Sequence, residues 1–202
     1  MLLASGPALA DEVVIATLGD SLTQGYGLVS EQGFVPQMQG WLDAQGLDVR
    51  LINAGVSGDT TAGGLARIHW TLTEDVDALI VALGGNDVLR GIDPGVSRAN
   101  LDGILSVAQD RKLPVLLVGI SVPGNYGPEY QTSFRAIFPE LAEIHGATLY
   151  PDFLTAITEE DTGTALATLL QGDGIHPNAE GVRRIVEDMG PSVKALVGAA
   201  KP

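Results

Sequence analysis

The 202-residue sequence predicts an α/β fold in which a five-stranded parallel sheet is covered by helices on both faces. Five short apolar segments alternate with longer segments whose apolar residues recur at helical spacing. No internal repeat or linker-like stretch interrupts this alternation. We therefore expect residues 11–202 to form a single domain, with right-handed crossovers between its strands.

The predicted strands are rich in branched apolar side chains. Residues 13–18 have the sequence Val-Val-Ile-Ala-Thr-Leu, which is typical of a strand buried on both faces of a sheet. The other strands are expected at residues 48–54, 77–83, 114–120 and 147–150.

Helices are predicted between the strands and after the last one. We expect them at residues 31–45, from the turn at 55–61 to about residue 72, at 94–110, at 128–145, and from residue 178 onward. Four of them have apolar residues at helical spacing that should face the core. In the helix at 94–110 these are expected to be Val96, Ala99, Ile104, Leu105 and Ala108, and in the helix at 128–145 they are expected to be Phe134, Ile137, Phe138, Leu141 and Ile144. A turn of helix is expected near residues 165–170, and Gly190-Pro191 should kink or break the last helix.

The composition indicates an acidic globular protein. Hydrophobic residues make up 45% of the chain and charged residues 18%, which excludes a disordered protein. The net charge of −14 opposes binding to nucleic acid or to an anionic membrane surface, because phosphate groups would repel the chain. No apolar run reaches the ~18 residues of a membrane span. The absence of cysteine excludes thiol catalysis, disulfides and cysteine-ligated metals.

Residues 1–10 are apolar and end in Ala8-Leu9-Ala10, which fits the small-residue cleavage site of an export signal. The segment is short for a signal peptide and has no basic residue at its start. We interpret it as the remnant of a signal peptide, with an unstructured terminus as the alternative. A periplasmic or secreted protein is therefore expected, and a cytoplasmic one is the alternative.

Polar turns follow three of the predicted strands. They are Gly19-Asp20-Ser21, residues 55–59, and Gly84-Gly85-Asn86-Asp87. Because the carboxyl ends of parallel strands lie at one edge of a sheet, where ligands bind in open α/β folds, these turns should converge in space. A fourth polar segment, Asp173-Gly174-Ile175-His176-Pro177-Asn178, directly precedes the last predicted helix.

These segments contain the groups that acyl transfer needs. A serine hydroxyl becomes a nucleophile when a base takes its proton, and that base is usually histidine. His176 is the candidate base because it lies in a loop, whereas His69 and His145 lie within predicted helices, where structural roles are expected. Asp173, three residues before His176, can orient the imidazole and leave its other nitrogen free for Ser21.

Donors for a developing oxyanion are also present. The Ser21 N–H at a helix start, the Gly58 N–H and the Asn86 side-chain amide can each face such a charge. Each residue also has a structural explanation, as a helix cap or as a turn residue. Their joint occurrence with His176 and Asp173, in order along one sheet edge, favours a catalytic site.

The sequence offers weaker alternatives for the chemistry. Ser57 and Ser121 each miss the Gly-x-Ser-x-Gly pattern at its last position. Gly25-Tyr26-Gly27 lacks the third glycine of a dinucleotide-binding fingerprint. No tight ligand spacing supports a metal site, which would have to draw on Asp20, Asp87 and His176. We therefore expect neither a cofactor nor a metal ion.

The polar segments together resemble the sequence blocks of the SGNH, or GDSL, hydrolase family. Gly19-Asp20-Ser21-Leu22-Thr23 is similar to the first block, and residues 53–60, 84–87 and 173–177 are similar to the others. The resemblance implies that the nucleophile is Ser21, that the oxyanion donors are Ser21, Gly58 and Asn86, and that Asp173 and His176 complete a triad. Within the family, loops 84–91 and 122–127 are most similar to those of the bacterial arylesterase and acyl-CoA thioesterase I/lysophospholipase L1 group.

This resemblance implies a flavodoxin-like sheet, no cofactor, and hydrolysis of small-molecule carboxylic esters and thioesters by a periplasmic or secreted enzyme. It also implies that loops 88–93 and 122–126 flank the acyl site. Val122, Tyr126 and Ile175 are expected to line the pocket, and loop packing is the alternative explanation for them. Two other functions stay open at this point: a carbohydrate O-acetyl esterase, and a non-catalytic binding module on the same fold.

Overall fold

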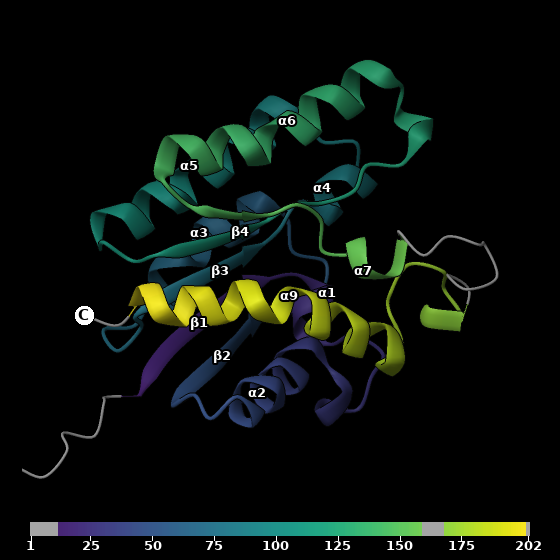
Figure 1. Cartoon of the computed structure of the whole chain (residues 1–202). Helices are drawn as coiled ribbons and strands as arrows, with labels where there is room; N and C mark the ends of the chain where they lie inside the picture. The colour runs from purple at the N-terminus through teal and green to yellow at the C-terminus, as the bar shows by residue number, and fades with distance from the viewer. Residues whose placement is uncertain (1–11, 159–167, 201–202) are drawn as a thin grey trace, which may run out of the picture.

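The structure, a computed structural model, describes residues 12–158 and 168–200 (Figure 1). The signal-peptide interpretation of residues 1–10 and the first half of the helical turn expected at 165–170 lie outside the described residues.

A five-stranded sheet forms the centre of the molecule, as predicted. Its strands are β1 (Val13–Gly19), β2 (Val49–Gly55), β3 (Ala78–Ala82), β4 (Val115–Val118) and β5 (Thr148–Tyr150). They lie in the order β2-β1-β3-β4-β5, and all neighbouring pairs are parallel. Gly19, the last residue of β1, pairs with Gly55 of β2 and with Ala82 of β3, so these three strands end at the same level.

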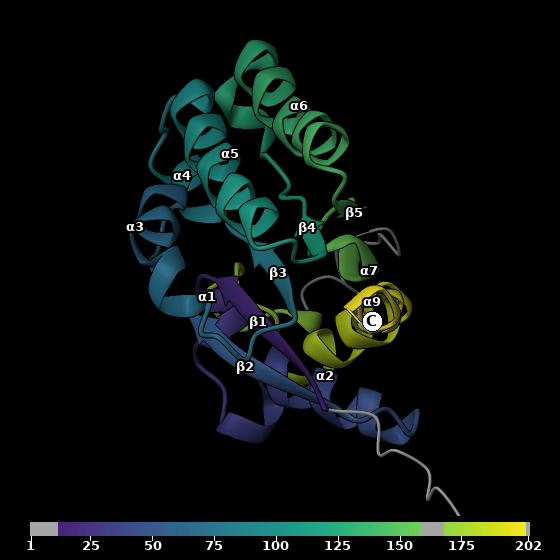
Figure 2. The same ribbon diagram turned by 90° about the vertical axis from the view of Figure 1, so that its left-hand side faces the viewer.

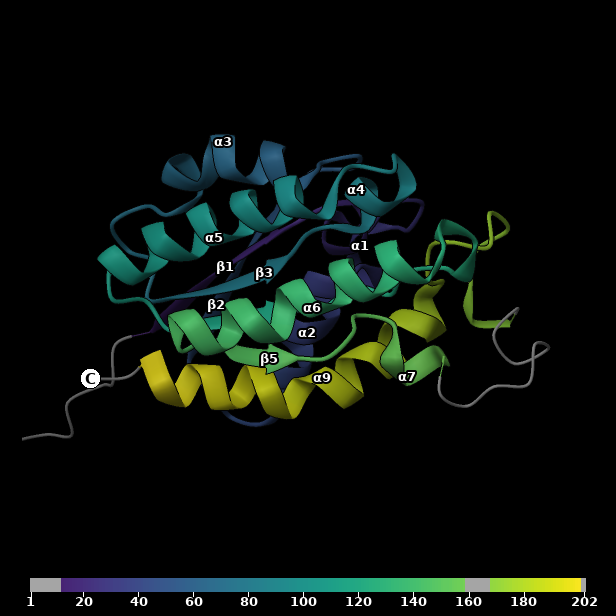
Figure 3. The same ribbon diagram turned by 90° about the horizontal axis from the view of Figure 1, so that it is seen from above.

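Helices cover both faces of this sheet (Figures 2 and 3). The face formed by Ile15 and Ile80 packs against α2 (Phe34–Ala44) and α9 (Ala179–Ala200). The opposite face, formed by Ala16 and Leu79, packs against α3 (Thr61–Thr71), α5 (Pro94–Asp110) and α6 (Pro128–His145). With side chains packed on both faces, all seven residues of β1 are buried, as its apolar sequence predicts.

Short helices gather at the carboxyl end of the strands. They are α1 (Ser21–Gln24), η1 (Ser30–Gln32), α4 (Gly85–Leu89), η2 (Gly124–Tyr126) and α7 (Thr155–Thr158). Figures 1 and 3 show α1, α4 and α7 at the end of the sheet that lies away from the C-terminus. None of the helices within residues 12–158 and 168–200 is long and apolar enough to cross a bilayer.

Three residues expected to face the core are exposed instead. Val96 and Ala99 lie on the solvent side of α5, because its buried stripe runs through Ser97 and Leu101. Ile144 is 59% exposed. The last turn of α6 contacts α5 through the neighbouring His145, whose imidazole binds Asp102 and Gln109.

The break expected at Gly190-Pro191 does not occur, and α9 continues through Pro191. Met189 and Val193, on either side of the proline, are fully buried. Gly190 lies so close to α2 that an added Cβ would be 2.7 Å from the Trp41 ring. Packing of α9 on α2 therefore offsets the backbone hydrogen bond that proline removes.

Candidate active site

Ser21 lies directly beyond β1, at the point where the chain turns from the strand into α1. Asp20 is the N-cap of this helix, and its Oδ1 accepts a hydrogen bond of 3.0 Å from the Leu22 N–H. Gly19 is required here because a Cβ would lie 2.0 Å from the Thr23 hydroxyl. In the sheet, β2 lies on one side of β1 and β3 lies on the other, so Ser21, which follows β1, lies at a topological switch point.

His176 comes from a hairpin that precedes α9, which we call the histidine hairpin (residues 169–178). An antiparallel bridge between Leu170 and Pro177 closes it, and the Asn178 N–H donates to Leu169 O over 2.9 Å. Inside it, Asp173 Oδ1 accepts the N–H groups of Ile175 and His176 at 2.9 and 3.0 Å. Asp173 Oδ1 thus stabilises the turn of the hairpin, while Oδ2 stays available for a contact with the imidazole.

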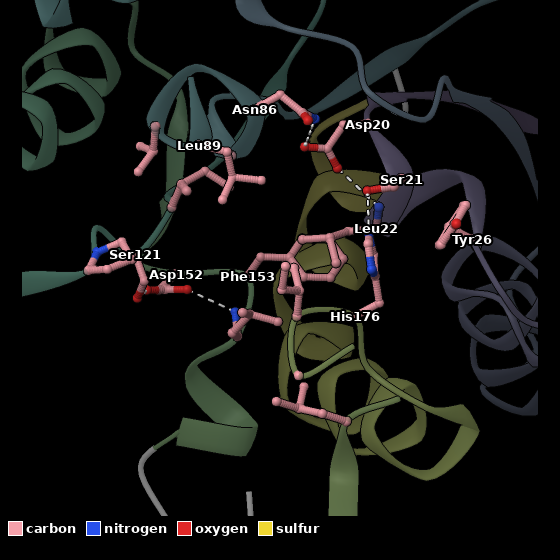
Figure 4. Close-up of a pocket in the computed structure, with 18 of the residues that line it drawn as sticks. Asp20, Ser21, Leu22, Tyr26, Asn86, Leu89, Ser121, Asp152, Phe153 and His176 are labelled. Carbon is pink, nitrogen blue, oxygen red and sulfur yellow. Dashed lines mark hydrogen bonds between the residues drawn. The ribbon is translucent and has the colours of Figure 1, made fainter. Parts of the chain in front are cut away.

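The structure brings Ser21, His176 and Asp173 together. Figure 4 shows the side chains of Ser21 and His176 pointing toward one another. His176 Nε2 lies 2.9 Å from Ser21 Oγ, and His176 Nδ1 lies 2.6 Å from Asp173 Oδ2. The N–H groups of Ile175 and His176, followed by the imidazole, hold the pKa of Asp173 well below its usual range. An ionised Asp173 accepts a hydrogen bond from the Nδ1–H of His176 and so favours the tautomer in which Nε2 is unprotonated and can accept a proton from serine.

The two other candidate oxyanion donors face the same space as Ser21. Asn86 is the second residue of α4, after Gly84 at a φ of 127°. Gly58 has a φ of 81°, and the Arg90 guanidinium donates to its carbonyl oxygen over 2.7 Å. Ser21, Gly58 and Asn86 all line one cavity.

Asp20 has a place in the site that the sequence did not indicate. It is only 3% exposed, and its Oδ2 accepts a 3.3 Å hydrogen bond from Asn86 Nδ2. Burial raises the pKa of Asp20 to about 6, and the hydrogen bonds from Leu22 and Asn86 partly oppose this rise. An acidic residue at the end of a fully buried strand was the signal in the sequence that could have identified it.

Asp87 anchors the helix that holds Asn86. Its carboxylate is fully buried and accepts hydrogen bonds from the Thr61 N–H, the Thr61 hydroxyl and the Ser97 hydroxyl, at 2.9, 2.5 and 2.9 Å. These bonds join α4 to α3 and α5 and fix the backbone next to Asn86. Among the described residues, no group of three or more acidic or histidine side chains could hold a metal ion.

A largely apolar cavity of about 500 Å³ opens beside Ser21 and His176. Apolar side chains from four segments line it, including Leu22, Leu89, Ile120, Phe153, Leu154 and Ile157. Val122 and Ile175 also line it, at the positions expected from the sequence. Tyr126 is not among the described residues that line this cavity, because its ring stacks on Tyr130 at a centroid distance of 5.2 Å.

The alternative serines and histidines have other contacts. Ser57 donates to Gln24 Oε1 over 2.7 Å, and Ser121 donates to Asp152 at the edge of the cavity. His69 is exposed on α3, and His145 joins α6 to α5. The structure therefore places only His176, of the three histidines, beside a serine hydroxyl within the described part of the chain.

Comparisons with known proteins find similar sequences over most of the chain. The model of the GDSL-like lipase/acylhydrolase family matches residues 17–184. Esterase TesA of Pseudomonas aeruginosa is 38% identical over 184 residues, which cover 91% of this chain and 89% of that protein. The thioesterase 1/protease 1/lysophospholipase L1 of Escherichia coli is 33% identical over 198 residues, which cover 98% of this chain and 90% of that protein.

A solved structure is similar over almost the same length. The psychrotrophic esterase EstA from Pseudoalteromonas sp., in a crystal structure inhibited by monoethylphosphonate, matches with a TM-score of 0.83 at 33% identity. The match covers 92% of this chain and 98% of that one.

Proposed function

Because the chain belongs to the GDSL-like lipase/acylhydrolase family, we propose that it is a serine esterase that hydrolyses carboxylic esters and acyl thioesters through an acyl-enzyme intermediate. One observation supports this proposal above the others. Ser21 Oγ and Asp173 Oδ2 lie within hydrogen-bonding distance of opposite nitrogens of the same imidazole, at 2.9 and 2.6 Å.

Acylation begins when Ser21 Oγ attacks the acyl carbonyl carbon. His176 Nε2 takes the hydroxyl proton as the bond forms, and the carboxylate of Asp173 stabilises the resulting imidazolium. The tetrahedral intermediate collapses, the bond to the leaving group breaks, and His176 returns the proton to the departing alcohol or thiol. Ser21 is then esterified by the acyl group.

Deacylation repeats these steps with water as the nucleophile. His176 Nε2 takes a proton from water, the hydroxide attacks the acyl carbon, and the bond to Ser21 Oγ breaks as His176 returns the proton to that oxygen. In both steps the Ser21 N–H, the Gly58 N–H and the Asn86 amide donate to the oxyanion. Each such donor contributes about 3 kcal/mol to transition-state stabilisation.

The cavity indicates the class of acyl group. Its lining is mostly apolar and its volume is about 500 Å³, which suits aryl groups and acyl chains of short to medium length. A carbohydrate O-acetyl esterase is the second candidate within hydrolases. An acetyl group would leave most of this apolar surface in contact with water, so relative rates on acetyl and octanoyl esters distinguish the two activities.

A non-catalytic binding module on the same fold is the candidate from another class. We test it with Ser21→Ala and with a fluorophosphonate probe, which forms a covalent adduct with an activated serine. We expect the wild-type protein to be labelled and to hydrolyse p-nitrophenyl butyrate. Ser21→Ala should keep its melting temperature, lose labelling, and lose at least about 10⁴-fold in kcat. A folded Ser21→Ala protein with near-normal turnover would refute the assignment.

We further propose that the enzyme acts in the periplasm or outside the cell. The apolar residues 1–10, which end in Ala8-Leu9-Ala10, support this location. Cell fractionation of the full chain, with esterase activity as the readout, tests it. Activity confined to the cytoplasmic fraction would contradict export.

A further inference from the structure

The histidine hairpin has to be held at a defined distance from α1, although the two segments are far apart in the sequence. Ser21 and His176 are separated by 155 residues, and their side chains meet at one hydrogen bond of 2.9 Å. Asp173 cannot fix this distance, because its hydrogen bonds to Ile175 and His176 all lie within the hairpin. Another contact must therefore join the hairpin to α1.

Gln171 makes such a contact. Its side-chain Nε2 donates to two backbone carbonyl oxygens, Tyr26 O at 2.8 Å and Pro177 O at 3.0 Å. Its own backbone N–H donates to His176 O over 2.7 Å. A single residue is thus bonded to both sides of the hairpin and, across a sequence separation of 145 residues, to the segment that follows α1.

Tyr26 continues this connection to Ser21. The Tyr26 N–H donates to Ser21 O over 3.1 Å, and the Tyr26 ring packs against the His176 imidazole at a centroid distance of 4.8 Å. Figure 4 shows Tyr26 beside Ser21 and His176. Three hydrogen bonds therefore connect Ser21 to His176 by way of other residues: Ser21–Tyr26, Tyr26–Gln171 and Gln171–His176. The direct Ser21–His176 hydrogen bond closes this ring.

The fit around the Gln171 amide is close. The amide oxygen lies beside Gly27, where an added Cβ would be 2.1 Å from it. Gly27 has a φ of 76°, so the backbone that passes Gln171 takes a conformation that glycine adopts without strain. The amide is therefore held between two backbone segments and keeps them at a fixed separation.

We propose that Gln171 is a positioning residue for the hydrolytic reaction, and that its amide sets the distance between Ser21 Oγ and His176 Nε2. The inference rests on the proposed esterase function. Gln171 does not contact the reacting atoms, and it acts through Tyr26 O, Pro177 O and His176 O. Proton transfer depends steeply on this distance, and a shift of about 1 Å in a catalytic group costs on the order of 10²-fold in rate.

The test uses two substitutions of the same residue and a matched control. Gln171→Ala removes the amide, and Gln171→Glu keeps its shape while replacing the donor with a carboxylate that faces two carbonyl oxygens. Gln39→Ala is the control: Gln39 Nε2 also donates to a distant backbone oxygen, Val49 O at 2.8 Å, but it joins α2 to the amino end of β2. The readouts are kcat and KM for p-nitrophenyl butyrate, the rate constant of inactivation by a fluorophosphonate, and the melting temperature.

We expect both Gln171 variants to lose about 10- to 100-fold in kcat and in the inactivation rate constant, with KM changed by less than about threefold. Gln39→Ala should keep the wild-type kcat even if its melting temperature falls. Gln171→Glu keeps the test valid if Gln171→Ala does not fold.

Three results would overturn the proposal: a folded Gln171 variant with kcat within twofold of wild type, a loss confined to KM, or an equal loss of kcat in Gln39→Ala. A wild-type protein that neither hydrolyses esters nor reacts with the fluorophosphonate would instead refute the proposed function, and with it this inference.

Discussion

The sheet edge that holds Ser21 and Asn86 and the hairpin that holds Asp173 and His176 are stabilised by different forces. At the sheet edge, the adjoining side chains of Asp20 and Asp87 are 3% and 0% exposed and are packed among core elements. In the hairpin, Asp173 and Ile175 are exposed, and hydrogen bonds within the loop set its shape. One half of the site is therefore part of the folded core, and the other half can change with little effect on the core.

The carboxylates of the two regions illustrate this difference. Burial raises the pKa of Asp20 to about 6, so its charge at neutral pH destabilises the folded protein. Hydrogen bonds from Ile175 and His176 lower the pKa of Asp173, so its charge stabilises the hairpin. We expect substitutions of the buried carboxylates at the sheet edge to change mainly stability, and substitution of the exposed carboxylate in the hairpin to change mainly the rate.

The largest effect is expected for Asp173→Asn in the hairpin. The amide keeps the size of the side chain but no longer stabilises the Nδ1-protonated imidazole or its charged form, so kcat should fall by about 10³- to 10⁴-fold. The melting temperature should change little by comparison, because the hydrogen bonds of Asp173 lie within an exposed loop and not in the core. Steady-state kinetics and thermal unfolding check this prediction. A large loss of stability with a small loss of rate would remove the distinction between the two regions.

The second largest effect is expected for Asp87→Ala at the sheet edge. The substitution leaves the Thr61 and Ser97 groups buried without their acceptor and should lower the free energy of unfolding by about 3 kcal/mol. Urea unfolding at pH 7 measures this loss. Asp102→Ala is the control, because Asp102 also binds a neighbouring helix, through His145, but its side chain is 51% exposed. An equal effect of the two substitutions would contradict the role of burial.

The third prediction uses the pH dependence of stability. Well below pH 3.8, Asp20 is protonated in both the folded and the unfolded protein. Because the pKa of Asp20 is higher in the folded protein, the folded state is stabilised at low pH, and this stabilisation is lost as the pH rises through about 6. The free energy of unfolding of the wild type, relative to that of Asp20→Asn, should therefore decrease by about 2 kcal/mol between pH 4 and pH 8. Urea titrations at several pH values measure this difference, and a flat or rising one would show that burial does not dominate at Asp20.

The smallest effect is expected for Ile175→Ala at the rim of the cavity. Ile175 is 49% exposed and lines the cavity that we propose as the acyl site, so we expect KM for p-nitrophenyl octanoate to rise about two- to fivefold without loss of stability. Val122 lines the same cavity but is 3% exposed, so Val122→Ala should lower the free energy of unfolding by about 1 kcal/mol. Equal stability of the two variants would argue against this contrast.

The sequence predicted the features that depend on local patterns. The strand positions follow from apolar runs, and the fold that they imply is confirmed. The convergence of Ser21, Gly58 and Asn86 follows from one rule of parallel sheets, so it could be expected before the structure was known. The His176–Asp173 contact depends on a spacing of three residues, which the sequence also displays.

Features that depend on tertiary contacts could not be predicted in this way. The helix continues through Pro191 because Gly190 packs on Trp41, which lies about 150 residues earlier in the chain. Asp20 follows β1, and its partner Asn86 comes after the neighbouring strand β3. No sequence pattern near either residue indicates the hydrogen bond between them. The same holds for Gln171, whose partner Tyr26 is 145 residues away.

The place of the histidine hairpin in the chain has a consequence for biosynthesis. All five strands and the Ser21 turn precede it, and it connects directly to α9, which packs on α2 and on four of the strands. During translation the sheet and the proposed nucleophile Ser21 emerge from the ribosome before the proposed general base His176 does. A nascent chain can therefore complete its sheet without being able to cleave an ester, and turnover begins only when the final helix docks.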